Sequence, residues 1–152
     1  MTIIPFTIKG YEDLKIELEN ILAKRPAAVK TLTQGREMGD LSENGLYKAA
    51  KMELSNIDHQ IRHLKNLVLY GRVFTPTDNN TVQLGHVVTV ETETGKREFA
   101  IVGEWEANPR DGKISHKSPI GHNLMGRKMG EIVKITTPLK RIEYRIINIA
   151  QQ

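Results

Sequence analysis

Two stretches in the first half of the chain repeat apolar residues at helical spacing. In the first stretch the positions recur at alternating steps of four and three and read Leu14, Leu18, Ile21, Arg25, Ala28 and Leu32. In the second stretch the same alternation gives Ala50, Leu54, Ile57, Ile61, Leu64 and Val68. Such steps place residues on one face of an α-helix. We therefore expect two long helices over about 11–34 and 46–70, each with one narrow apolar seam.

The two seams predict that the helices pack against each other. Neither helix can bury its seam alone, whereas pairing the helices buries both, so we expect an antiparallel coiled coil. Two residues of the first helix do not fit this pattern. Arg25 interrupts the seam, and the ring of Pro26 should kink the helix or break it near Arg25. Residues 35–45 contain three glycines, which indicate the turn of a helical hairpin.

The second half of the chain carries the pattern of β-strands. Residues 87–92 and 97–102 are rich in strand-forming residues and flank a turn at 93–96 that contains Gly95. Two further strands are expected at 131–135 and 144–149. A short helix or turn is expected at 122–128. These elements predict a small antiparallel sheet with at most one short helix.

The change of periodicity divides the chain into two domains. We expect a coiled-coil hairpin over 1–75, a connector rich in turn formers at 76–80, and the sheet domain over 81–152. The expected fold class is therefore α+β. The 152 residues are enough for this arrangement and too few for a large multidomain assembly.

Composition narrows the possible chemistry. The chain has no cysteine, which excludes disulfides, thiolate metal sites and a cysteine nucleophile. Its formal net charge of +4 is only mildly basic and argues against a simple DNA-coating role. The apolar runs are too short to cross a bilayer, and the N-terminus lacks a basic segment that leads into an apolar one. We expect a soluble, unexported, cytoplasmic protein without a membrane partner.

The predicted hairpin turn contains two carboxylates three residues apart, Asp40 and Glu43. One interpretation is a capping box, with Asp40 as the N-cap of the second helix and Glu43 as its third residue. The other is a shared site for a hard cation, because Mg²⁺ prefers oxygen ligands and often takes one or two from a protein. Two carboxylates would leave most of the octahedral shell to a partner molecule. The sequence alone leaves both interpretations open.

Other candidate sites are weaker. His59 and His63 have the spacing of helical metal ligands, but no third ligand or general base accompanies them, so we interpret them as outer-face residues. Three basic residues, Arg36, Lys48 and Lys51, lie near the acidic pair in sequence. They are either ordinary surface charges or contacts for a phosphate backbone. No phosphate-binding loop or catalytic triad is evident.

The turn sequence resembles a known family. Residues 36–44, together with Tyr47 and residues 49–51, are similar to the signature of the GreA/GreB bacterial transcript cleavage factors. Further similarity lies in residues 7–14, 101–103, 114–115, 118–121 and 124–130, in the family's order and spacing, and the chain looks closer to GreA than to GreB. The resemblance implies an N-terminal antiparallel coiled coil and a C-terminal FKBP-like domain.

The resemblance also implies a function. In the family, the globular domain docks at the rim of the RNA polymerase secondary channel, and the hairpin reaches the active centre. Asp40 and Glu43 would help to bind a second Mg²⁺, shared with polymerase and not bound stably by the factor alone. The polymerase would then cut the 3′ end of backtracked nascent RNA. Arg36 and Lys51 match basic family positions near the RNA, and Lys48 is added on proximity.

The same resemblance assigns a docking role to Ser118 and Pro119. The sequence differs from the family pattern at two positions. Lys117 stands where some members have an acidic residue, and Leu46 stands where members often have a glutamate. Lys117 bears on the strength of docking, whereas Leu46 and the basic pI of about 9.3 favour a second hypothesis, a channel-binding regulator that blocks or modulates polymerase without promoting cleavage. A third hypothesis, a peptidyl-prolyl isomerase, follows from the fold alone and lacks an aromatic-rich pocket. The protein is expected to be no enzyme by itself and monomeric when free.

Overall fold

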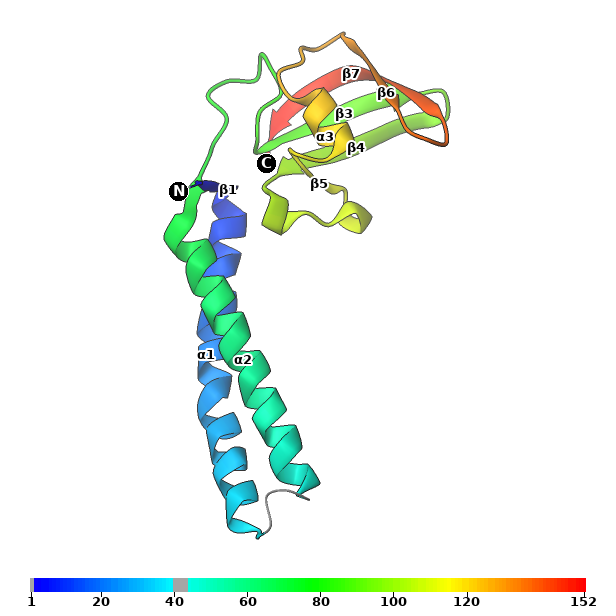
Figure 1. Ribbon diagram of the computed structural model, residues 1–152. Helices are drawn as coiled ribbons and strands as arrows, with labels where there is room; N and C mark the ends of the chain where they lie inside the picture. Colours follow the sequence, from blue (N-terminus) through cyan, green and yellow to red (C-terminus); the bar gives the residue numbers. More distant parts are fainter. Residues whose placement is uncertain (1, 40–43) are drawn as a thin grey trace. The chain divides into compact units, whose positions relative to one another are not determined.

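The computed structural model describes residues 2–39 and 44–152. Its internal contacts group these residues into two units (Figure 1). The hairpin unit comprises Glu12–Gly71, and the sheet unit comprises Thr2–Tyr11 with Arg72–Gln152. Within this part of the chain, no helix is long and apolar enough to cross a membrane.

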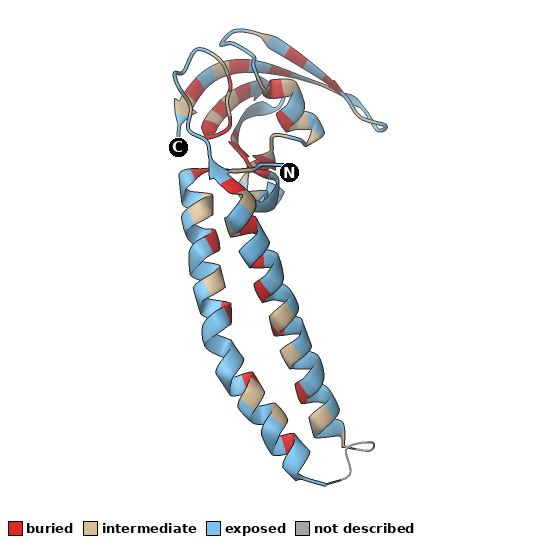
Figure 2. Ribbon diagram, turned by 60° about the vertical axis from the view of Figure 1, so that its left-hand side comes forward, coloured by how far each residue is buried: buried red, intermediate tan, exposed pale blue. Residues whose placement is uncertain are grey.

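Two antiparallel helices form the hairpin unit, as the periodicity predicted. Helix α1 runs over Ile8–Glu37, with its first turn in the sheet unit, and α2 runs over Gly45–Tyr70. The buried residues of α1 recur every seven positions: Leu14, Ile21, Ala28 and Gly35. Those of α2 are Ala50, Ile57, Ile61, Leu64 and Leu67. Buried positions line the facing sides of both helices in Figure 2, so the seams are confirmed, with Leu67 as an addition.

Pro26 and Arg25, the two residues that did not fit the seam of α1, behave differently in the structure. The helix continues through Pro26, so the expected break near Arg25 is wrong. Arg25 reaches across to α2, where its Nε donates to Asp58 Oδ1 at 2.6 Å and its Nη2 donates to Oδ2 at 3.3 Å. This hydrogen-bonded pair lowers the pKa of Asp58 and raises that of Arg25. The interruption of the seam is therefore an ion pair between the helices.

The sheet unit contains a mixed sheet in the order β5-β4-β3-β7-β6. Its strands are β3 (His86–Thr92), β4 (Gly95–Val102), β5 (Lys113–Ser115), β6 (Ile132–Thr136) and β7 (Arg141–Gln151). The four predicted strands are present. The purely antiparallel sheet is wrong, because β5 pairs with β4 in parallel. A strand of three residues offers too little alternation to be recognised in a sequence.

Shorter elements complete the sheet unit. They are the 3₁₀ helices η1 (Glu104–Glu106) and η2 (Pro109–Asp111), the helix α3 (Pro119–Leu124), and the paired strands β1 (Ile4–Phe6) and β2 (Gly71–Val73). The helix expected at 122–128 thus begins and ends earlier, because Ser118 is its N-cap. The core lies on one face of the sheet, where Phe99 and Tyr144 meet edge to face at 5.6 Å.

The N-terminal segment is fixed to the sheet unit through Glu106. This carboxylate accepts hydrogen bonds from the Thr7 amide at 2.9 Å, from the Thr7 hydroxyl, and from the Gly103 amide at 3.0 Å. The packing is tight, since a Cβ on Gly103 would collide with the Pro5 carbonyl. One side chain therefore satisfies three donors from segments far apart in sequence.

A buried histidine organises the segment before β3. His86 Nδ1 accepts from the Gln83 amide at 2.8 Å, so in the neutral ring Nε2–H points to Asn79 Oδ1, 3.0 Å away. Burial lowers the pKa of His86 below the ordinary value of 6.5, against a smaller opposing effect of Asp78. The neutral ring therefore stabilises this segment.

We expect Glu106→Ala to lower the free energy of unfolding of the full chain by about 2 to 3 kcal/mol, because three partly buried donors lose their acceptor. The neighbouring Glu104 is a matched control, since its contact with Lys117 at 3.3 Å is exposed. Glu104→Ala should cost less than about 1 kcal/mol. Urea unfolding of both variants measures the difference, and equal costs would contradict the anchoring role of Glu106.

We also expect the protein to lose stability as the pH falls below about 6.5. The unfolded chain binds a proton at residue 86 more readily than the folded chain, so His86 can contribute a slope of at most about 1.4 kcal/mol per pH unit. His86→Gln should flatten the profile between pH 7 and 5. The same change at the exposed His122 should leave it unaltered, and urea unfolding at several pH values checks both.

Candidate functional site

The candidate site lies at the loop end of the hairpin unit. Asp40 and Glu43 themselves fall outside the described residues. Helix α2 begins at Gly45, and Asn44 is its N-cap. The expected capping box, with Asp40 as N-cap and Glu43 as third helical residue, is therefore wrong, because both residues precede the actual N-cap.

Asn44 connects the two helices at this end. Its Oδ1 accepts from the Tyr47 amide at 3.0 Å, which caps α2, and its Nδ2 donates to the Gly35 carbonyl at 2.7 Å. Gly35 lies in the last turns of α1. We call the hydrogen bond from Asn44 to Gly35 the Asn44 clasp. The sequence analysis missed Asn44, although an asparagine directly before a helix is a common N-cap signal.

A close approach of the backbones accompanies the clasp. A Cβ on Gly35 would lie 3.2 Å from the Tyr47 Cα and 3.4 Å from the Tyr47 nitrogen. Gly35 is buried, so its lack of a side chain lets the two helices come together here. The Arg36 guanidinium carbon lies 6.0 Å from the centroid of the Tyr47 ring, at the outer limit of a cation–π contact.

The structure places the three predicted basic residues on the helix turns next to the loop. Arg36 is in the last turn of α1, whereas Lys48 and Lys51 are in the first two turns of α2. All three are exposed. Their charges are therefore available at the same end of the hairpin unit as the acidic loop.

The histidine pair remains without a metal-site context. His59 and His63 are exposed on α2. Among the residues that the structure describes, no group of three or more acidic, histidine or cysteine side chains could bind a metal ion. The exposure of both residues agrees with our interpretation that they lie on the outer face of the helix.

Ser118 and Pro119 lie in the sheet unit at the start of α3. Ser118 Oγ accepts from the Gly121 amide at 3.1 Å and donates to the Ser115 carbonyl at 2.7 Å, and Pro119 occupies the first turn. Both residues thus have a local structural role. Their predicted docking role stays a prediction.

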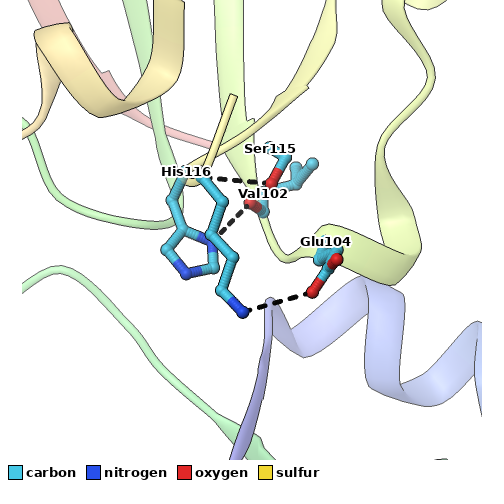
Figure 3. Close-up of polar contacts among 5 residues, drawn as sticks. Val102, Glu104, Ser115 and His116 are labelled. Atoms are coloured by element: carbon cyan, nitrogen blue, oxygen red, sulfur yellow. Dashed lines mark hydrogen bonds and ion pairs between the residues drawn. The ribbon is translucent and has the colours of Figure 1, made fainter. Parts of the chain in front are cut away.

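The residues directly before Ser118 make polar contacts with Val102, Glu104 and Ser115 (Figure 3). The His116 amide donates to the Val102 carbonyl at 3.0 Å, and the Lys117 amide donates to Ser115 Oγ. The Lys117 ammonium lies 3.3 Å from Glu104 Oε2, and both side chains are more than half exposed. The positive charge at position 117 is therefore partly offset by a neighbouring carboxylate.

Comparison with known proteins places both halves of the chain in one class, that of transcription elongation factors. Residues 4–72 match the model "Transcription elongation factor, N-terminal", and residues 77–151 match "Transcription elongation factor, GreA/GreB, C-term". The chain belongs to the GreA/GreB family.

Individual relatives agree with this assignment. Transcription elongation factor GreA of Thermodesulfovibrio yellowstonii is 40% identical over 97% of this chain and 96% of its own length. GreA of Lactococcus lactis subsp. lactis is 39% identical over 95% and 96%. Among solved structures, GreA factor homolog 1 of Thermus thermophilus is 28% identical, covers 97% of this chain and 99% of its own, and has a TM-score of 0.47.

The close approach at Gly35 generates a prediction. Gly35→Val should lower the free energy of unfolding by about 1 to 3 kcal/mol, because the added side chain meets the Tyr47 backbone, which cannot move without opening the hairpin. Gly45→Val is the matched control, since a Cβ there has nothing within 4 Å. Thermal unfolding followed by circular dichroism at 222 nm compares the two. A larger loss for Gly45→Val would contradict the close approach.

Proposed function

We propose that this protein enters the secondary channel of RNA polymerase and stimulates Mg²⁺-dependent cleavage of the 3′ end of nascent RNA in backtracked complexes. The protein has no complete active site of its own in this proposal and activates hydrolysis by the polymerase. The observation that carries the proposal is family membership over both halves of the chain, and the acidic pair of the sequence directly precedes Asn44, the N-cap of α2.

The donor set suits the cation. Asp40 and Glu43 offer only oxygen ligands, which Mg²⁺ prefers, and two carboxylates leave the remaining octahedral positions to polymerase carboxylates and water. A second Mg²⁺ at such a site would supply an activated water and stabilise developing charge. The role of this chain is to bring two ligands, and the exposed Arg36, Lys48 and Lys51 would contact the RNA phosphates beside them.

The hairpin gives the proposal a physical basis for action at a distance. Helix α2 has 26 residues, which correspond to about 39 Å at about 1.5 Å per residue. A hairpin of this length can present ligands far from its own opposite end. Buried seam residues on both helices make the hairpin stiff. Little conformational entropy would therefore be lost when the hairpin places its loop in the channel.

One observation favours a second candidate function. Leu46, where many family members have a glutamate, is 63% exposed in the first turn of α2 and offers no ligand to a metal. A protein that occupies the channel and modulates transcription without promoting cleavage would tolerate this residue. The isomerase hypothesis receives no such support, since Phe99 and Tyr144 are buried in the core.

Asp40→Ala and Glu43→Ala should each reduce the rate of RNA cleavage by about 100-fold, because a misplaced or missing ligand disrupts the reacting geometry. The assay uses stalled, backtracked elongation complexes with Mg²⁺, and gel analysis of the released 3′ fragments gives the rate. Glu53→Ala, an exposed acidic residue on α2, is the matched control and should cleave normally.

Binding to polymerase is measured in parallel by competition. Both acidic-pair variants should bind as the parent does. Cleavage that survives both substitutions would refute the role of the acidic pair. A parent protein that competes for polymerase but never stimulates cleavage would instead support the regulator.

A further inference from the structure

The Asn44 clasp uses a property that distinguishes asparagine from the other good N-cap residues. Aspartate, serine and threonine can accept the Tyr47 amide equally well. Ionised aspartate has no donor, and the hydroxyl of serine or threonine must accept and donate through one oxygen on a shorter side chain. Asparagine has a separate amide donor, which here binds the Gly35 carbonyl at 2.7 Å. The cap alone therefore does not account for asparagine at this position, whereas a bond between the helices does.

The clasp spans the loop that carries the acidic pair. Gly35 and Asn44 are nine positions apart, and the hydrogen bond joins the α1 side of the loop directly to the first residue of the α2 side. The Asn44 carbonyl also accepts the Lys48 amide at 3.1 Å, so Asn44 is tied to the first turn of α2 by backbone as well as side chain. The two ends of residues 36–43 are thus fixed relative to each other.

The surroundings keep the clasp in place. The missing side chain of Gly35 allows the approach to Tyr47, and the asparagine is half-buried rather than exposed to competing water. A hydrogen bond protected in this way constrains the distance between the loop ends more strongly than one on an open surface.

We propose that Asn44 is a positioning residue for transcript cleavage. By joining α2 to the Gly35 carbonyl, it sets the distance between Gly35 and Asn44, the two residues between which the chain carries Asp40 and Glu43. This inference rests on the proposed function. Misplacement of a reacting group by about 1 Å can cost about 100-fold in rate, so a change in this distance should affect the chemical step.

Two substitutions separate the clasp from the cap. Asn44→Ser keeps a neutral N-cap acceptor, but its side chain is too short to reach Gly35. Asn44→Asp keeps the size and the cap but cannot donate. Asn20→Asp, an exposed position on α1, is the control for the added charge. Helix content of all variants is measured by circular dichroism.

The cleavage rate in backtracked complexes is measured at increasing concentrations of full-length factor. We expect both Asn44 variants to lower the maximal rate by roughly 10- to 100-fold. The factor concentration at half-maximal rate and the helix content should stay within twofold of the parent, and Asn20→Asp should match the parent in all three.

Three results would overturn the inference: unchanged maximal rates for both variants, impairment of Asn44→Asp alone, which would indicate charge, or a rise in the half-maximal concentration without a loss of maximal rate. Failure of the proposed function is recognised separately, because the parent itself would then not stimulate cleavage. In that case the clasp is tested by the exchange rates of the backbone amides at the end of α1. Both Asn44 variants should exchange these amides faster than the parent, and unchanged rates would also overturn the inference.

Discussion

The hairpin unit depends on the burial of two narrow apolar seams that can be covered only by each other. The seam of α1 repeats every seven residues, and its side chains become smaller toward the loop: Leu14, Ile21, Ala28 and Gly35. At the last of these positions only backbone remains, which lets α1 approach Tyr47 and brings a carbonyl within reach of Asn44. At the loop end of the hairpin, the apolar contacts between the helices are thus followed by the hydrogen bond from Asn44 to the Gly35 carbonyl.

The sequence predicted those features that depend on local periodicity. Helices with three-four spacing and strands with alternation were recognised, since each residue in such a pattern indicates the same element. Features that depend on single contacts between distant residues were not. The bond between Thr7 and Glu106 joins residues 99 positions apart, and nothing near either of them signals it. The Arg25–Asp58 pair was missed for the same reason, whereas β5 was missed because its three residues show too little alternation.

The candidate site was predicted in a different way. Periodicity located the loop, but spacing alone favoured the capping box over the cation site and left both open for Asp40 and Glu43. The structure removes the capping box because Asn44 caps α2. Asn44 was missed because two N-cap signals stand close together in the sequence. The spacing of Asp40 and Glu43 fits a capping box, and Asn44 directly before the helix fits a simple N-cap. Ser118 and Pro119 have a structural role at the start of α3, and their docking role stays a prediction.

The separation between cap and carboxylates has a consequence for function. If Asp40 or Glu43 had capped α2, every substitution there would change stability and chemistry together, and evolution could alter one only at the cost of the other. With Asn44 as the N-cap, neither carboxylate occupies the N-cap position of α2. A carboxylate keeps its lone pairs for a cation only where backbone donors do not take them. In the proposed function, the N-cap and the two metal ligands are therefore close in sequence but different residues.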